Sequence, residues 1–194
     1  MKRDSYLNFL RSRLSEKRLL HSISVAEHLL SFGRGLGLDS ESMETAGLLH
    51  DCCRSLDDEA MLKAANRYGI PVTDICRERP ILLHGPIGAE FIRREFGIKD
   101  EALLEAVRWH TTGHPGIGLL AQALFVADFS EPLRKYPEAG EAREVLRSSG
   151  FDAALRYVAQ TKLAFARKKE RFHPETEAFC AWVEAGCPVI AVAQ

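Results

Sequence analysis

The sequence lacks an excess of charge of either sign, because 26 lysine and arginine residues face 27 acidic residues and the net charge is −1. It therefore has no overall basic field of the kind that carries non-specific nucleic-acid binding, and we expect no nucleic acid among its partners. No run approaches the roughly eighteen apolar residues of a membrane span, so no membrane association is expected. The N-terminal segment is interrupted by charges every few positions, unlike the continuous apolar core of a secretory signal.

Cysteine is present but lacks the spacing of a metal or redox motif. The five cysteines are odd in number and form no Cys-x-x-Cys pair. Zinc and redox sites built on that motif are therefore excluded, and the adjacent Cys52 and Cys53 are interpreted as small buried packing positions. Reduced thiols are the simplest interpretation, and they predict a cytoplasmic location.

The alternating pattern of β-strands is also missing, whereas apolar residues recur three or four positions apart along most of the chain. We therefore predict an all-α fold. The chain has 194 residues and shows no internal repeat, low-complexity segment or long linker. Residues 1–194 are accordingly expected to form a single helical domain with a C-terminal helical extension.

Caps and helix breakers predict the helix boundaries. Ser40 or Ser42 is the expected cap of one helix, Pro86 the expected start of another, and Asp100 the expected cap of a third. The predicted helices are residues 18–35, 40–53, 86–96, 101–109, 118–130, 138–148 and 151–169, with one more opening at Asp57-Asp58 and a last one after His173-Pro174.

A His-Asp pair, His50-Asp51, ends the apolar stretch AGLLHDCC. Ionisable groups are costly to bury there without a partner, and a divalent metal is such a partner. Adjacent imidazole nitrogen and carboxylate oxygen donors suit iron, manganese or zinc. On its own such a pair is weak evidence, because it more often marks a helix end that carries surface polar groups.

Other ionisable residues lie within or beside apolar helices. Asp128 follows a mostly apolar run and needs a cation, which is either a metal or an arginine. His21 lies on an apolar helix face, where a histidine is often only a core residue. His84 and His110 lie at predicted helix ends, where histidines and free backbone amides can bind phosphate. One site in a compact domain would collect all of them together with His50-Asp51.

The order of these residues resembles that of the HD superfamily of metal phosphohydrolases, which has a histidine on one helix, a His-Asp pair on the next and a distant aspartate. The words RLLHSISVA, LLHDCCR, LLHGPIGAEF, AVRWHTTGHPG and ADFSEPLR resemble those of the bacterial YqeK group over roughly residues 10–180. The resemblance implies an HD-domain helical bundle. It also implies symmetrical hydrolysis of diadenosine tetraphosphate to two ADP, with iron as the metal, one or two ions, and manganese or another divalent metal as the alternative.

Carried over residue by residue, the resemblance implies that four side chains are the metal ligands: His21, His50, Asp51 and Asp128. His84 and His110 are implied either to complete a second metal site or to contact the substrate phosphates, and with Asp51 they are the predicted catalytic residues.

The same resemblance makes Arg18 and Arg134 phosphate-binding cations, and it brings His173 and Thr176 of the word HPET over the nucleotide. Arg54 stands where the group often has lysine, and it supplies charge with a different geometry.

His28 and His114 are expected to lie outside this site, on a helix face and in a turn. The predicted reaction is attack by metal-activated water on an inner phosphorus. An HD phosphohydrolase acting on another nucleotide and a non-catalytic nucleotide-binding helical module remain alternatives, and a homodimer is compatible with the sequence.

Overall fold

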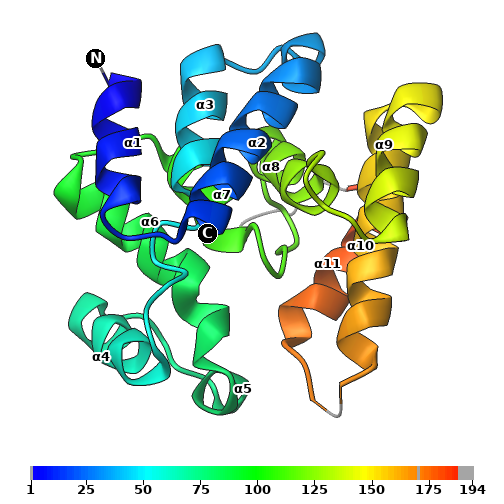
Figure 1. The fold of residues 1–194 in the computed structure, drawn as a ribbon. Coiled ribbons are helices and arrows are strands. Elements are labelled where there is room, and N and C mark those ends of the chain that lie inside the picture. The colour runs from blue at the N-terminus through cyan, green and yellow to red at the C-terminus, as the bar shows by residue number, and fades with distance from the viewer. Residues whose placement is uncertain (1, 170, 188–194) are drawn as a thin grey trace, which may run out of the picture.

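The computed structural model describes residues 2–169 and 171–187, and these residues form helices with no β-strand among them (Figure 1). The all-α prediction is confirmed. The helices are α1 (Lys2–Arg11), α2 (Glu16–Gly33), η1 (Arg34–Leu36), α3 (Ser40–Leu49), α4 (Asp58–Tyr68), α5 (Asp74–Glu78), η2 (Pro80–Leu83), α6 (His84–Glu95), α7 (Glu101–Trp109), α8 (Leu119–Ser130), α9 (Pro137–Ser149), α10 (Phe151–Arg167) and α11 (Pro174–Glu184). Residues 1, 170 and 188–194 of the predicted single domain lie outside the described residues.

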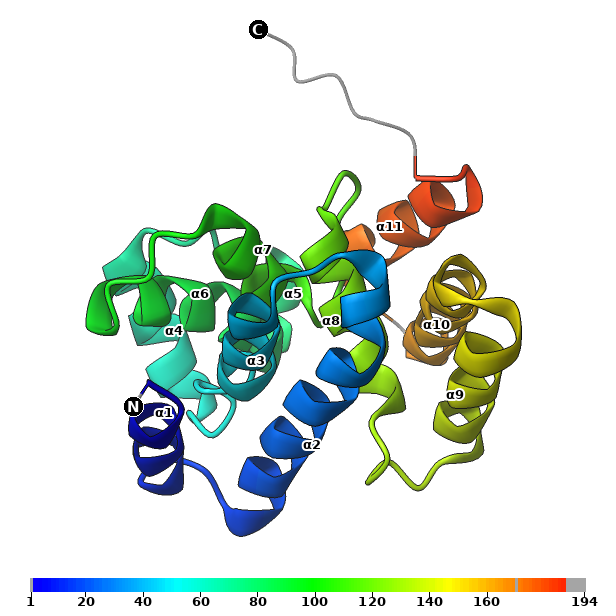
Figure 2. The same cartoon turned by 90° about the horizontal axis from the view of Figure 1, so that it is seen from above.

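Helix α8 is the centre of the packing. Most of its residues are buried, as expected for a helix that is apolar on all sides. It contacts α2 and α3 on one side, α7 on another, and α9 and α10 on a third (Figure 2). The C-terminal helices therefore pack against the same central helix as the N-terminal ones.

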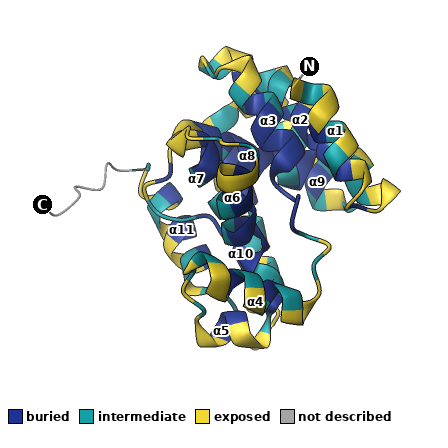
Figure 3. Cartoon of the chain, turned by 90° about the vertical axis from the view of Figure 1, so that its left-hand side faces the viewer, coloured by how far each residue is buried: buried dark blue, intermediate teal, exposed yellow. Residues whose placement is uncertain are grey.

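The core follows this arrangement. Figure 3 shows buried residues concentrated on α3, α6, α7 and α8, whereas α4 and α5 carry many exposed residues at the periphery. The largest fully buried side chains include Phe125 of α8 and Phe179 of α11, whose rings meet edge to face at a centroid distance of 4.8 Å. This contact joins the C-terminal extension to the central helix.

Three of the predicted boundaries that differ from the structure do so for local reasons. Helix α3 is capped by Asp39, whose carboxylate accepts the amide of Ser42, so neither Ser40 nor Ser42 is the cap. The same helix ends at Leu49, four residues before the predicted end, and His50 and Asp51 lie in the turn that follows. Helix α6 begins at His84 and not at Pro86, because the first amides of a helix need no intrahelical acceptor and proline is tolerated in that turn.

Three further elements were not predicted. Helix α1 is amphipathic, and it buries Tyr6 and Leu10, which lie four residues apart. Helices α5 and η2 occupy the region between Pro71 and Pro80 and just beyond it, which the prolines had marked as irregular. Both are short, and contacts with neighbouring elements support them.

Among the described residues, no helix combines the length and the apolar character that a bilayer span requires.

The closest helix contact on the N-terminal side joins α2 and α3 at Gly47. A Cβ atom placed on Gly47 would lie 2.5 Å from the Cα of Ala26, which is backbone and fully buried. The absence of a side chain at Gly47 therefore permits the approach that brings the end of α3 beside α2.

We expect Gly47→Ala to lower the free energy of unfolding by about 1–2 kcal/mol, because the steric cost of overpacking exceeds the helix propensity gained. Gly35→Ala is the matched control, since a Cβ there would meet no atom of the described residues within 4 Å. Urea denaturation of both variants measures the difference. Equal stability of the two variants would contradict the proposed close contact.

Candidate metal centre

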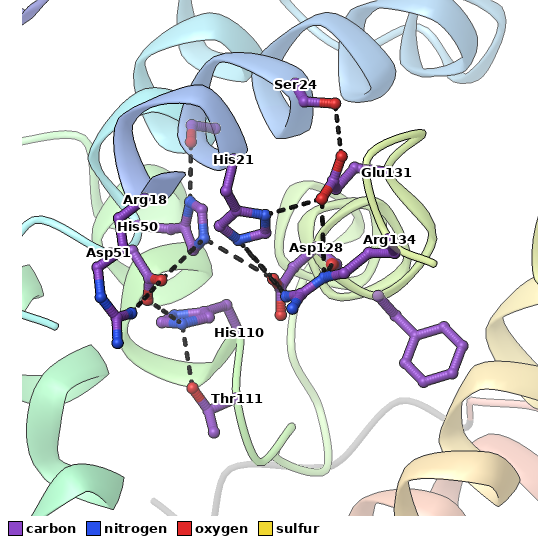
Figure 4. A network of polar contacts seen from close by, with 12 residues as sticks. Arg18, His21, Ser24, His50, Asp51, His110, Thr111, Asp128, Glu131 and Arg134 are labelled. Carbon is purple, nitrogen blue, oxygen red and sulfur yellow. Dashed lines mark hydrogen bonds and ion pairs between the residues drawn. The ribbon is translucent and has the colours of Figure 1, made fainter. Parts of the chain in front are cut away.

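Six ionisable side chains from five helical segments lie close together, and Figure 4 shows His21, His50, Asp51, His110 and Asp128 among them. His21 comes from α2, His50 and Asp51 follow α3, His84 begins α6, His110 follows α7, and Asp128 lies near the end of α8. All six belong to the predicted site, and the structure brings them together.

Two sets of three donor atoms share Asp51. His21, His50 and Asp51 offer ligand atoms within 4.8 Å of one another, and so do Asp51, His84 and His110. Asp128 adjoins the first set, with its Oδ1 3.2 Å from Nε2 of His21 and 3.8 Å from Nε2 of His50. In the second set, Oδ1 of Asp51 lies 3.1 Å from Nε2 of His84 and 3.5 Å from Nε2 of His110.

Three of the histidines are oriented by the same backbone contact. Each donates its Nδ1–H to the carbonyl oxygen of the residue three positions earlier, His50 to Gly47, His84 to Ile81 and His110 to Val107. A neutral imidazole that donates from Nδ1 presents a free lone pair at Nε2. All three Nε2 atoms are therefore set up as metal ligands, the arrangement that orienting contacts produce in metal sites.

The surroundings of the His50 Nε2 atom indicate whether a divalent metal fits this donor set. It is buried and has no hydrogen-bond partner among the described residues, while the residue itself is 0% exposed. A buried polar atom without a partner costs free energy, and a cation facing the lone pair removes that cost. The donor set therefore fits a divalent metal with nitrogen and oxygen ligands.

His84 and His110 provide a second sign of a cation. Their Nε2 atoms lie 3.0 Å apart, although both rings donate from Nδ1 and so both present lone pairs. The Thr111 hydroxyl lies 3.0 Å from one Nε2 atom and 3.2 Å from the other, but its single proton can satisfy only one of them. A shared cation relieves the remaining repulsion.

The protonation states agree with metal binding. Burial raises the pKa of a carboxyl group, but the nearby histidines outweigh it at Asp51 and hold its pKa well below the usual range. The same balance, with His21 and Arg134 as partners, lowers the pKa of Asp128. Burial lowers the pKa of His50 to about 4, so its ring is neutral. Anionic carboxylates and a neutral imidazole are the states in which these groups bind a metal.

His21 differs from the other histidines. Burial lowers its pKa, but hydrogen bonds to Asp128 and Glu131 raise it to about 9. Nδ1 lies 3.0 Å from Oε1 of Glu131, and Nε2 faces Asp128. A metal bound at Nε2 would displace a proton from His21, and the contact to Glu131 could remain.

The metal centre lies in a cavity of about 1220 Å³. Arg18 lies beside Asp51, with 3.8 Å between its Nη1 and Oδ2. Arg134 donates from Nη2 to Oδ1 of Asp128 at 2.7 Å. The other cations of the lining are Lys17, Arg54, Arg79, Lys135, Lys162 and Lys169. Acidic groups meet at the metal centre while cations surround it, which is the charge distribution expected for a site that binds a polyanion.

The C-terminal extension forms part of this cavity. His173 and Thr176 both line it, as their predicted nucleotide contact requires. The ring of His173 also caps α11 by accepting the amide of Glu175 at 3.3 Å. The extension contributes further lining residues, among them Lys162, Phe165 and Phe172.

The residues that were expected outside the site lie outside it. His28 contacts the hydroxyl of Ser130 at 2.9 Å, and His114 stacks on Trp109, and neither lines the cavity. Cys52 and Cys53 are each 3% exposed and belong to the core.

Two charged residues close to the candidate ligands themselves were not predicted. Glu131 is 1% exposed and lies three positions after Asp128. This spacing places both residues on the same side of a helix end, and it was the sequence feature that could have identified Glu131. Lys162 interrupts the apolar pattern of α10, four positions after the buried Val158.

Comparison with known protein sequences identifies the family of this chain. The HD domain family matches residues 18–133 of the chain. The symmetrical bis(5'-nucleosyl)-tetraphosphatase of Bacillus subtilis is 30% identical over 96% of this chain and 100% of its own length. The enzyme of the same name from Halalkalibacterium halodurans is 32% identical over 91% of this chain and 94% of its own.

The fold is also similar to that of a solved structure. It is described as a predicted HD superfamily hydrolase involved in NAD metabolism from Clostridium acetobutylicum. The two folds superpose with a TM-score of 0.88 at 29% identity, over 94% of this chain and 97% of the other. With six predicted ligand and catalytic side chains gathered at one point and relatives matched along nearly their whole length, the chain belongs to the HD domain family, in the YqeK group of symmetrical tetraphosphatases.

Proposed function

We propose that this chain is a metal-dependent phosphohydrolase that splits diadenosine tetraphosphate symmetrically into two ADP. The observation that carries the proposal is the pair of three-donor sets sharing Asp51 at a cavity lined with cations. The full-length similarity to two symmetrical bis(5'-nucleosyl)-tetraphosphatases supports this substrate.

Iron is the metal we propose, with manganese or another divalent ion as the alternative, because the donors are only imidazole nitrogen and carboxylate oxygen. His21, His50, Asp51 and Asp128 hold the first ion. We assign a second ion to Asp51, His84 and His110 because of the facing Nε2 atoms. A divalent metal supplies a water that is acidic near neutral pH and polarises phosphoryl oxygens.

The residues of the chain position the substrate. Asp51 and Asp128 keep their charge and orient the attacking water, while Arg18 and Arg134 hold the phosphates on either side. The water oxygen bonds to one central phosphorus, and the bond from that phosphorus to the bridging oxygen breaks. The bridging oxygen leaves with its electron pair on the second ADP.

Symmetrical cleavage follows from where the cations lie. Arg18 is beside Asp51 and Arg134 is beside Asp128, so each side of the metal centre has a phosphate-binding cation. A chain of four phosphates bound across the centre then presents its central linkage to the water. His173 and Thr176 are proposed nucleotide contacts because they line the same cavity from α11.

A cytoplasmic location is part of the proposal, since all five cysteines are free thiols. Two rival functions keep the same geometry. An HD hydrolase of another nucleotide would release phosphate or linear products and no ADP, and a nucleotide-binding module would bind without turnover. Chromatography of the products formed from diadenosine tetraphosphate separates the proposed function from both rivals. Metal analysis after anaerobic purification, paired with a hydrolysis assay, identifies the non-catalytic module.

We expect His50→Ala and Asp51→Ala to lose turnover of diadenosine tetraphosphate, since each removes a donor from the shared centre. The measurement is ADP formation by chromatography, accompanied by circular dichroism to verify folding. His28→Gln is the control, because His28 lies outside the cavity. Full activity in either folded alanine variant would refute the assignment.

We expect chelation to abolish ADP formation and the return of ferrous iron under anaerobic conditions to restore it. Metal analysis of the purified protein should find a divalent ion in about the stoichiometry of one or two per chain expected for the two donor sets. Activity that persists in protein verified to be metal-free would eliminate the hydrolytic mechanism.

We expect Glu131→Gln to weaken metal binding by about 10–100-fold. Ser24 and the amide of Leu133 both donate to Oε2 of Glu131, so a glutamine oxygen would stay with them and its NH2 would face His21. The proton of His21 would then move to Nε2, where it blocks the ligand position. Metal titration measures the effect, with the exposed Glu144→Gln as the control. Equal affinities would show that Glu131 does not orient His21.

A further inference from the structure

Lys162 brings a positive charge to the metal centre from outside the segment 18–133 that matches the HD domain. It lies on α10, and its Nζ lies close to three residues, two of them on α8 and one just after α7. It donates to the carbonyl oxygen of His110 at 3.0 Å, lies 3.9 Å from Oδ2 of Asp128 and sits 4.0 Å from the ring centroid of Phe125. These contacts fix the ammonium at one position in the wall of the cavity.

The ammonium of Lys162 retains unused hydrogen-bonding capacity. It has three N–H donors, and the carbonyl of His110 is the acceptor recorded for it within the described part of the chain. The 3.9 Å contact to Asp128 is too long for a hydrogen bond. Two donors therefore remain for a ligand in the cavity.

Packing alone does not account for a lysine at this position. Burying an ammonium costs several kcal/mol, on the order of magnitude known for buried ions, and an apolar side chain would fill the space between α10 and α8 without that cost. The side chain of Lys162 is 17% exposed, so it is largely withdrawn from solvent. A charge kept there is useful if it meets a negative ligand.

Arg134 is less available to bind a negatively charged ligand, because its guanidinium is already hydrogen-bonded to Asp128. Its guanidinium donates from Nη2 to Oδ1 of Asp128 and from Nε to the carbonyl of the same residue at 3.1 Å. Lys162 faces the other carboxylate oxygen without such a bond. The ammonium of Lys162 is therefore the less committed cation next to Asp128.

We propose that Lys162 is a catalytic residue that binds the phosphate of the departing nucleoside diphosphate. The inference rests on the proposed function. As the water oxygen bonds to one central phosphorus, the bond to the bridging oxygen breaks, and that oxygen departs with the electron pair. One proton of the water goes to solvent and the other stays on the new phosphate hydroxyl of the first ADP. The ammonium keeps its own protons and neutralises the negative charge that develops on the departing phosphate.

The test uses the metal-loaded full chain and two substitutions. Lys162→Met keeps the apolar stem and removes the charge, whereas Lys162→Arg keeps the charge. We expect Lys162→Met to lower kcat by about 100-fold and to weaken ADP binding by at least about 10-fold, with metal content and melting temperature unchanged. Lys162→Arg should recover part of both losses. Lys168→Met is the control, because Lys168 is an exposed lysine nearby that does not line the cavity.

Kinetics, calorimetric titration with ADP and metal analysis on the same preparations distinguish the outcomes. Unchanged kcat and ADP affinity in Lys162→Met would overturn the proposal. Loss of metal or of stability in parallel with activity would also overturn it, since Lys162 would then only hold α10 against the centre. If the native protein binds ADP through Lys162 but releases no ADP from diadenosine tetraphosphate, the proposed function fails while the phosphate contact is supported.

Discussion

The buried carboxylate of Asp51 is the constraint around which the rest of the structure is arranged. It is 7% exposed, and His50, His84, His110 and Arg18 all approach its two oxygens. An isolated anion at such depth would cost several kcal/mol, on the scale known for buried charges. Helices from distant parts of the chain therefore have to end near one another, because each contributes a partner to the same group. Metal binding completes this balance of charge.

At the ends of α3 and α7, one hydrogen bond from a histidine both caps the helix and orients the imidazole ring. The last carbonyl groups of a helix lack intrahelical donors. His50 and His110 donate to Gly47 and Val107 in the last turns of α3 and α7, so they cap those helices. The same hydrogen bonds set the tautomer and aim Nε2 at the metal. The geometry of the site is thus coupled to helix termination, and the close contact of Gly47 with Ala26 keeps α3 beside the helix that carries His21.

The sequence predicted the parts of this arrangement that are local or carried by motifs. The residues of the two donor sets were all identified, since histidine and aspartate in apolar helices are informative and the words around them resemble a known group. Glu131 and Lys162 were not predicted from the sequence, because their role depends on burial by tertiary packing. Glu131 is followed by Pro132 in a polar segment, and Lys162 is one of many lysines. The cap at Asp39 and the start of α6 at His84 were missed by one or two residues, because several neighbouring residues could serve equally well by local rules.

The segment matched by the HD domain and the C-terminal extension contribute different charged groups to the site. The segment matched by the HD domain supplies the donor groups that could hold a metal, and its carboxylates concentrate negative charge at the centre. The extension supplies Lys162, Lys169, His173 and Thr176 along the cavity wall. A carboxylate-rich centre alone would repel a polyphosphate, whereas cations on the wall attract it and leave the metal-facing side free. The extension therefore places positive charge beside the negative centre, which is the distribution that favours binding of a polyanion.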